Sequence, residues 1–352
     1  MKPTVCVVVP VYKAEHTIDR CVASILAQDV PGGVSCVLVD DGSPDDSGLL
    51  CDAWAAKSRR VKVIHQEDKG VSSARNAGLA MVDAEFVVFL DSDDALRDGA
   101  LEAAVDAQRQ AHDDFVLWHY TTDQFDDALT QPDGKICPSS ALARLYLDCL
   151  IAMPWNKLYR ADLAKQLQFN ESYTLGEDLQ FVLDYIAALQ KSTPGWRFWV
   201  MDAPLTFYNC DTGGTSLSTR YHSDYCEIWP RHFARLNDAC TALQVPAEDL
   251  LPLHRAELTV LAEGVADILR RDPAQMGQRR DKAIRELCNP WLRQLLHTMR
   301  REKNYSAYYL PVFWKNLHLL YTTAEDKRTG SPLYGKLAWL GYYLFLGRRR
   351  RE

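Results

Sequence analysis

Four near-continuous apolar runs, separated by segments of helical periodicity, organise the first 100 residues. Short apolar runs of this kind are typical of buried parallel strands, and connections of helix length predict right-handed crossovers between them. The pattern therefore predicts an α/β fold around a mainly parallel central sheet. The expected strands are residues 5–12, 36–43, 61–66 and 86–90. Helical segments are expected at 17–28, between the first two strands, and at 96–110, after the fourth strand.

Polar residues follow three of these strands, at Pro10–Glu15, Asp40–Asp45 and Asp91–Asp94. Because the carboxyl ends of parallel strands meet at one edge of a sheet, we expect the three clusters to lie together. Crowded carboxylates repel one another unless a cation lies between them, and oxygen ligands suit Mg²⁺ or Mn²⁺. Asp91 and Asp93 are two residues apart, so both would face one side of a continued strand. A divalent-cation site is expected, and from this segment alone a solvated acidic loop stays open.

A second acidic pair begins a helical pattern later in the chain. Residues 176–189 carry apolar positions at helical spacing, with Glu177 and Asp178 in the expected first turn. The helix dipole favours ionised carboxylates there, and a general base must be ionised to accept a proton. The residues themselves leave open whether this pair acts as a base or only caps the helix.

Composition places the chain among ordinary globular proteins. Its 352 residues exceed one average domain, and 47% are hydrophobic and 25% charged. The ten cysteines show no C-x-x-C spacing, so we expect reduced thiols and neither a disulfide framework nor a zinc ribbon. The chain enters a strand directly and has no apolar stretch of 18 residues. We therefore expect no signal peptide, no transmembrane helix and a cytoplasmic location.

Charge is unevenly distributed along the sequence. The whole chain carries −7, whereas residues 297–352 contain eleven Lys and Arg against four Asp and Glu. An acidic body with a basic, aromatic-rich tail argues against a nucleic acid partner and favours an anionic membrane surface. The apolar stretch 337–347 before Arg348–Arg351 is too short to span a bilayer but suits a helix lying on one. A helical pair packed on the protein itself is the alternative.

Six motifs in order resemble family 2 glycosyltransferases, which are inverting enzymes of GT-A fold that use nucleotide-activated sugars. The resemblance covers roughly residues 3–220. Within the family, the chain is similar to the bacterial members that build cell-surface glycans. It implies a Rossmann-like GT-A catalytic domain over 1–220. Residues 221–300 would then be an α-helical appendage that packs on it, forms a homodimer or frames the acceptor, and 301–352 a set of basic aromatic helices. The motifs are VVVPVYKAE, VDDGSPDDS, KGVSSARNAGL, FLDSDD, PWNKLYR and GEDLQF.

The resemblance implies metal-assisted, inverting transfer from a nucleoside diphosphate sugar to a hydroxyl of a glycan or lipid-linked acceptor. UDP is the nucleotide that the family favours, and Mn²⁺ or Mg²⁺ is the expected cofactor. Asp178 would be the general base, with Glu177 beside it. The alternative is a nucleotide-sugar-binding scaffold with impaired catalysis. A nucleotidyltransferase is disfavoured because residues 9–16 contain no glycine.

The same resemblance assigns residues to ligands. Asp93 would hold the metal together with Asp91, and Trp155 would stack on an acceptor sugar unless it is buried in a domain wall. Arg75 would reach a phosphate or order the aspartates, with a surface salt bridge as the alternative. The basic residue expected near Asn209 and Cys210 is absent, which weakens the phosphate-binding assignment of the following loop. Donor-binding residues are expected to be Pro10, Tyr12, Glu15, Asp41, Gly70, Arg75, Asp91, Ser216, Ser218 and Arg220.

Overall fold

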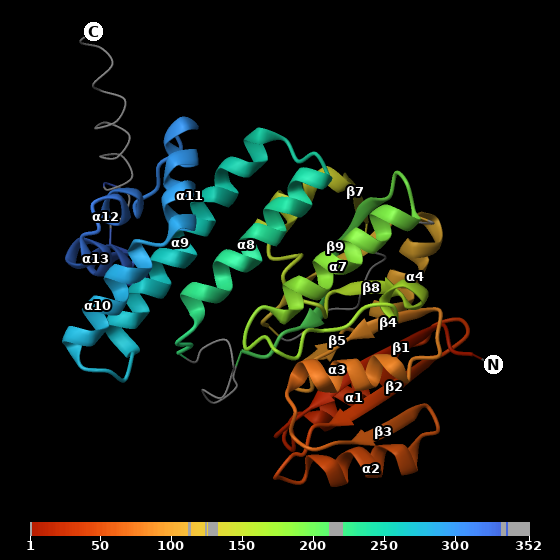
Figure 1. Ribbon diagram of the computed structural model, residues 1–352. Coiled ribbons are helices and arrows are strands. Elements are labelled where there is room, and N and C mark those ends of the chain that lie inside the picture. The colour runs from red at the N-terminus through yellow and green to blue at the C-terminus, as the bar shows by residue number, and fades with distance from the viewer. Residues whose placement is uncertain are drawn as a thin grey trace. The chain divides into compact units, whose positions relative to one another are not determined.

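Parallel strands near the beginning of the chain form the centre of a mixed sheet. The computed structural model describes residues 2–111, 114–123, 125, 133–210, 221–331 and 336. The chain divides into two compact units, Met1–Ser216 and Leu217–Glu352. Every strand of the described residues belongs to the first unit, and the described part of the second unit is helical (Figure 1).

The strands of the described residues form one sheet in the order β3-β2-β1-β4-β8-β6-β9-β5, with β7 paired to β9. β1 is parallel to β2 and β4, and β2 is parallel to β3, whereas β8 is antiparallel to both neighbours. The predicted α/β fold with a mixed, mainly parallel sheet is confirmed. The strands are β1 (Val5–Val11), β2 (Val34–Asp40), β3 (Val61–His65), β4 (Phe86–Phe89), β5 (Ala95–Leu96), β6 (Phe115–Thr121), β7 (Gly134–Pro138), β8 (Lys157–Arg160) and β9 (Arg197–Phe207).

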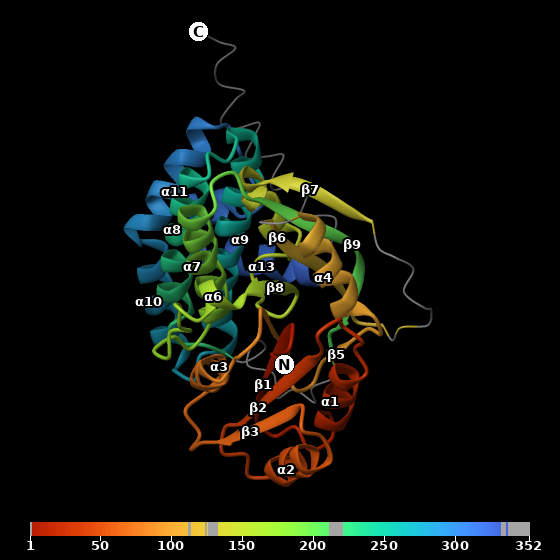
Figure 2. The ribbon, with the colours of Figure 1, turned by 90° about the vertical axis from the view of Figure 1, so that its right-hand side faces the viewer.

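Different helices cover the two faces of the parallel strands. α1 (Ile18–Leu26) and α4 (Ala100–Ala111) share one core with alternate residues of β1. α3 (Val71–Ala80) lies on the other face, where a Cβ on Gly78 would come within 2.4 Å of Val8. Figure 2 shows α1 and α3 on opposite sides of β1 and β2. Because both faces are covered, all seven residues of β1 are buried and its sequence is continuously apolar. The other helices of this unit are α2 (Ser47–Lys57), α5 (Leu142–Leu147), α6 (Ala161–Ala164) and α7 (Glu177–Ser192).

The chain turns immediately after β4. β4 ends at Phe89, and the backbone N–H of Asp94 donates to the carbonyl of Asp91 at 3.0 Å. Asp91 and Asp93 therefore lie on a turn, and the expectation that the strand continues through them is wrong. A turn directs the three carboxylates of this segment into different environments, as described below.

The expected helix 96–110 begins later than the periodicity suggested. Leu96 belongs to β5, which pairs with Thr206 of β9, and the N–H of Arg97 donates to the carbonyl of Leu205 at 2.9 Å. Since these backbone groups are used by the sheet, α4 starts only at Ala100.

Aromatic packing fixes the start of α7. Gly176 precedes the helix with φ of 78°, a left-handed conformation that favours glycine. The ring of Phe181 stacks on Phe169 with centroids 4.0 Å apart, and its edge contacts Phe89 of β4 at 5.4 Å. The predicted helix is confirmed, and its acidic first turn is held beside the end of β4.

The second unit consists of helices in the residues that the structure describes. Its core joins Leu258 and Leu292 to Tyr308 and Leu320, and so includes residues on both sides of position 300. Within the described ranges, no helix is both long and apolar enough to cross a membrane. All ten cysteines of the chain are free, as their spacing predicts. The helices are α8 (Tyr225–Ala242), α9 (Ala247–Arg271), α10 (Met276–Leu287), α11 (Pro290–Arg301), α12 (Tyr309–Phe313) and α13 (Leu317–Arg328).

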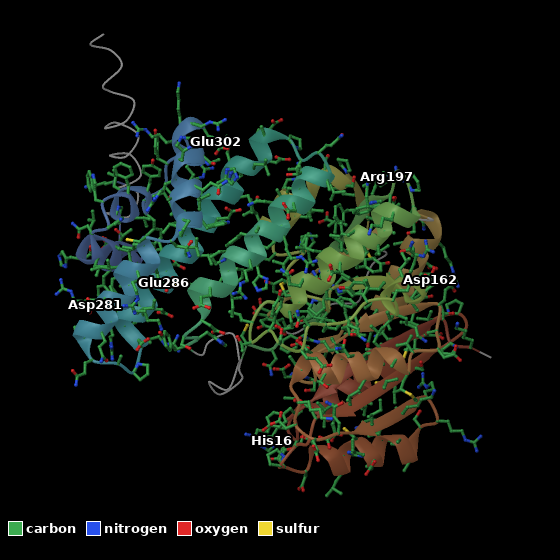
Figure 3. The ribbon with its side chains drawn as sticks, in the orientation of Figure 1. His16, Asp162, Arg197, Asp281, Glu286 and Glu302 are labelled. Atoms are coloured by element: carbon green, nitrogen blue, oxygen red, sulfur yellow. The ribbon has the colours of Figure 1, made fainter. Side chains whose placement is uncertain are left out.

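A buried carboxyl group lies on α9. Glu257 is fully buried, and its Oε1 accepts a hydrogen bond from Asn237 Nδ2 at 2.8 Å, while Oε2 has no hydrogen bond partner in the described ranges. Burial raises the pKa of Glu257 to about 8, and the negative charge of Glu302 adds to this shift. Glu302, labelled in Figure 3, is itself paired with His254 at 2.9 Å.

We predict that Glu257→Gln stabilises the second unit in a pH-dependent manner. An acid whose folded pKa lies above its unfolded value contributes most stability below the unfolded pKa and loses it as pH rises toward the folded pKa. The neutral amide should therefore leave Tm nearly unchanged at about pH 4 and raise it at about pH 8. Glu248→Gln, at an exposed position of the same helix, is the control. Equal changes in Tm at both pH values would show that folding does not raise the pKa of Glu257.

Candidate active site

The first two polar clusters are joined at the carboxyl ends of β1 and β2. The N–H of Ala14 donates to Ser47 Oγ at 2.8 Å, and the N–H of Asp46 donates to Glu15 Oε2 at 3.2 Å. Glu15 therefore holds the loop after β2, and its Oε1 lies 3.4 Å from Nε2 of the exposed His16, labelled in Figure 3. The expectation that these clusters share one edge of the sheet is confirmed.

Pro10 and Tyr12 lie at the end of β1. Pro10 is buried and lies opposite Val39 of β2. On its other side, the pairing of β1 with β4 has already ended at Val8. A proline is tolerated there because a strand without a second neighbour needs fewer donors. The side chain of Tyr12 is 44% exposed, with Lys13 Nζ 5.2 Å from its ring centre. Tyr12 is therefore not part of the core of the unit.

Asp41 organises the segment before α3. Its buried carboxylate accepts hydrogen bonds from Gln66 Nε2 at 2.7 Å, from the N–H of Lys69 at 3.0 Å and from the N–H of Gly70 at 2.8 Å. Gly70 has φ of 88°, and a Cβ there would meet no atom within 4 Å, so space lies open above its backbone. Asp40, not Asp41, holds the turn after β2.

Asp40 accepts from the N–H of Ser43 at 3.0 Å and pairs with His65 Nδ1 at 2.9 Å. His65 Nε2 pairs with Asp52 at 3.1 Å, and these two carboxylates raise the pKa of the imidazole. The turn that carries Asp41 is therefore anchored to β3 and α2.

The acidic turn after β4 contains two carboxyl groups with raised pKa. Burial raises the pKa of Asp93 to about 6 and that of Asp94 to about 9, and the charge of Asp91 adds to both shifts. Asp94 Oδ1 accepts from the N–H of Asn209 at 2.9 Å, which ties the turn to the end of β9. Among the residues that the structure describes, its buried Oδ2 has no hydrogen bond partner. Asp94 thus holds the end of β9 and does not cap α4. Nothing in the sequence indicated this long-range contact.

These carboxyl groups fit a hard divalent cation only in part. Charge repulsion and an unpartnered buried oxygen are what a nearby cation would relieve. Among the described residues, however, no three His, Cys, Asp or Glu side chains are arranged to hold a metal. Asp93 and Asp91 would therefore need further oxygen ligands from a bound diphosphate or water.

Arg75 joins the acidic turn to the first turn of α7. It is only 3% exposed, and its Nη2 lies 2.8 Å from Asp91 Oδ1. Its Nη1 lies 2.5 Å from Asp178 Oδ1 and 3.5 Å from Glu177 Oε1. The interpretation of Arg75 as a surface salt bridge is wrong, and the guanidinium orders the aspartates as the other interpretation expects.

Asp178 lies beside this guanidinium with its side chain 26% exposed. Burial raises the pKa of its carboxyl group well above the usual range, while Arg75 acts in the opposite direction. The contact with the guanidinium favours the ionised form, which a base needs to accept a proton. None of the side-chain hydrogen bonds found in the described residues shows Asp178 capping its own helix.

Trp155 does not offer a free ring face. It is 3% exposed and stacks on Tyr208, with ring centres 5.5 Å apart and planes within 13°. The ring of Tyr120 contacts both of them edge-on. In this structure Trp155 belongs to a wall of the unit, and Tyr208 and Tyr120 are its more exposed neighbours.

Lys157, from the motif PWNKLYR, fixes the loop in front of β8. It is fully buried and donates to Met153 O and Asn156 Oδ1 at 2.5 Å, while Asn156 donates to Trp118 O at 3.0 Å. Burial lowers the pKa of Lys157 well below its usual range. A single lysine in a polar motif gives no sign of its depth. The expected phosphate-binding residues Ser216, Ser218 and Arg220 lie outside the described residues.

Comparisons with known proteins find glycosyltransferases that are similar to parts of this chain. Residues 6–168 match the family model Glycosyl transferase family 2. The chain is 36% identical over 121 residues to the glycosyltransferase GlyG of Streptococcus pneumoniae, covering 34% of this chain and 40% of GlyG. It is 29% identical over 197 residues to the uncharacterized glycosyltransferase EpsJ of Bacillus subtilis, covering 52% and 56%. The matches thus span about half the length of these relatives.

A solved structure extends the likeness over most of the chain. S. aureus TarS 1–349 in complex with UDP-GlcNAc matches with a TM-score of 0.61 at 20% identity. The match covers 93% of this chain and 92% of the TarS chain. It confirms the expected GT-A fold.

Proposed function

Because residues 6–168 form a domain of glycosyl transferase family 2, we propose that the protein transfers a sugar from a nucleoside diphosphate sugar to an acceptor hydroxyl. The observation that carries the proposal is the arrangement around Arg75, which brings Asp91 and Asp178 to one guanidinium. A donor-side carboxylate and a candidate base are thereby held together at one edge of the sheet. An exposed aromatic ring, Tyr12, lies at the same edge.

The donor in this proposal is a UDP-sugar. The structurally similar TarS has been solved with UDP-GlcNAc and with UDP. In this chain the exposed ring of Tyr12 would lie against the base, and the open backbone at Gly70 allows a nucleotide to approach closely. Asp41 supports this surface, because it holds the N–H groups of Lys69 and Gly70.

A divalent cation, when bound, would neutralise charge that develops on the departing diphosphate. Asp93 and Asp91 are the residues that would hold it, and the diphosphate oxygens would complete its coordination. The raised pKa of Asp93 supports this assignment, since burial and the charge of Asp91 outweigh the opposing positive charge of Arg20. We therefore keep Mn²⁺ or Mg²⁺ as the expected cofactor.

Asp178 acts as the base in the proposed inverting reaction. It accepts the proton of the acceptor hydroxyl as that oxygen attacks C1 of the sugar and the bond from C1 to the diphosphate breaks. One base suffices, because no covalent enzyme intermediate forms. Glu177 contacts the same guanidinium at the longer distance of 3.5 Å. The acceptor is proposed to be a glycan or a lipid-linked oligosaccharide.

We predict that Asp178→Asn lowers turnover by about 100-fold or more and leaves the affinity for UDP close to that of wild type. The amide keeps the shape of the side chain but cannot take a proton, and general-base catalysis contributes on this scale. Turnover is measured on a panel of nucleotide sugars with Mn²⁺ or Mg²⁺, and affinity by calorimetry. UDP binding without turnover in wild type would instead favour a catalytically impaired scaffold.

We predict that Asp93→Ala abolishes metal-dependent turnover while the protein stays folded. Removing one carboxylate leaves a cation with too few protein ligands, so the charge of the diphosphate is poorly compensated. Turnover is measured across a titration of Mn²⁺, and folding by circular dichroism. Full activity of this variant, or of wild type in excess chelator, would rule out the metal assignment.

The end of the basic tail, with Arg348–Arg351, is proposed to bind an anionic membrane surface; residues 337–352 lie outside the described residues. Each basic residue near such a surface contributes on the order of 1 kcal/mol, and salt screens the attraction. Wild type should therefore co-sediment with anionic vesicles at low salt, and replacing Arg348–Arg351 by serine should weaken this. No vesicle binding, together with a lower Tm when the tail is removed, would show that the tail packs on the protein.

A further inference from the structure

Arg75 is buried inside the protein. Its two Nη atoms reach carboxylates on two different elements, and within the described part of the chain its buried Nε has no hydrogen bond partner. At 3% exposure, and with both Nη atoms held by carboxylates, the guanidinium is not presented to a phosphate at the surface. The assignment of Arg75 to donor binding, which came from the family resemblance, therefore does not fit this geometry.

The contacts of Arg75 divide each carboxylate into an occupied and an unoccupied oxygen. Nη1 contacts Oδ1 of Asp178, and Nη2 contacts Oδ1 of Asp91. No side-chain hydrogen bond to the Oδ2 atom of either residue is found among the described residues. One oxygen of Asp178 thus remains for an acceptor hydroxyl, and one oxygen of Asp91 remains for the donor side.

An aromatic platform holds the guanidinium in place. The Cζ of Arg75 lies 5.3 Å from the ring centre of Phe169, within cation–π range. Phe169 is in turn stacked on Phe181 of α7, with the two planes within 1°. The neighbouring residue Asn76 fixes the backbone of Phe169 from both sides, since its Nδ2 donates to Phe169 O at 2.9 Å and its Oδ1 accepts from Phe169 N at 2.8 Å.

We propose that Arg75 is a positioning residue that aims the base Asp178 and couples it to the donor-side carboxylate Asp91, with Asn76 and Phe169 as its support. The proposal rests on the function proposed above. It assigns a role to the consecutive pair Arg75-Asn76: one side chain holds the carboxylates, and the other holds the ring beneath it. Arginine is required because a lysine ammonium is a single point charge and cannot bridge two carboxylates in a fixed plane.

The test compares Arg75→Gln and Arg75→Lys with wild type. Both variants should lower kcat by about 30-fold or more while the KM for the donor and the calorimetric affinity for UDP change by less than about 3-fold. A phosphate-binding arginine would show the opposite division, with the main loss in UDP affinity. Arg109→Gln removes an arginine from a surface pair on α4 and should leave kcat unchanged.

A double-mutant cycle separates positioning from general damage. If Arg75 acts through Asp178, then adding Arg75→Gln to the Asp178→Asn variant should lower kcat only a few-fold further, because the base is already lost. Full additivity of the two losses, or a UDP affinity reduced by more than about 10-fold, would overturn the proposal. Wild type that turns over no nucleotide sugar would instead refute the proposed function, and the positioning role with it.

A milder pair of variants covers the case in which Arg75→Gln does not fold. Phe169→Leu keeps an apolar side chain but removes the platform, and should lower kcat by about 3- to 10-fold without weakening UDP binding. Phe115→Leu is the matched control, because Phe115 is buried in the same aromatic cluster but packs on Tyr159 and Tyr185. Equal kcat in the two variants at similar Tm would show that the platform has no positioning role.

Discussion

A positive charge buried among carboxylates is the constraint on which this site depends. Parallel strands deliver their carboxyl ends to one edge, and in this chain those ends carry acids at Asp41 and Asp91–Asp94. The first turn of α7 adds Glu177 and Asp178. Without a fixed counter-charge, this edge would repel itself. Removing one partner of a buried ion pair leaves the others uncompensated, at a cost of about 3–5 kcal/mol. Arg75 therefore holds Asp91 and Asp178 beside each other before any ligand binds.

The sequence predicts the parts of the site that depend on local pattern. Buried strands ending in acids, and a helix with an acidic first turn, follow from apolar periodicity, and each was found where expected. The role of Asp94 and the start of α4 depend on pairing with β9, more than 100 residues further along the chain. Nothing near residue 94 in the sequence records that partner. Long-range pairing overrides the local helical preference of Leu96 for the same reason.

Burial is the second property that the sequence leaves undetermined. Arg75, Trp155 and Lys157 are residue types that are usually found at surfaces or are only partly buried, yet all three are buried here. Their depth follows from the helix and sheet packed over them and not from their neighbours in the chain. For Trp155 this changes the interpretation, since a ring stacked on Tyr208 supports a wall and leaves Tyr208 nearer the open side.

Two buried basic side chains lie near Asp178, but only one of them supplies a dependable charge. Burial lowers the pKa of Lys157 well below its usual range, and its ammonium group has carbonyl and amide oxygens as hydrogen bond partners, not carboxylates. Arginine keeps its proton in such surroundings, and the nearby carboxylates raise the pKa of Arg75 further. Of these two side chains, only Arg75 therefore carries a fixed positive charge. Because the carboxylates around Arg75 outnumber its single positive charge, this edge of the sheet remains acidic. A divalent cation that binds together with a diphosphate would neutralise the remaining negative charge.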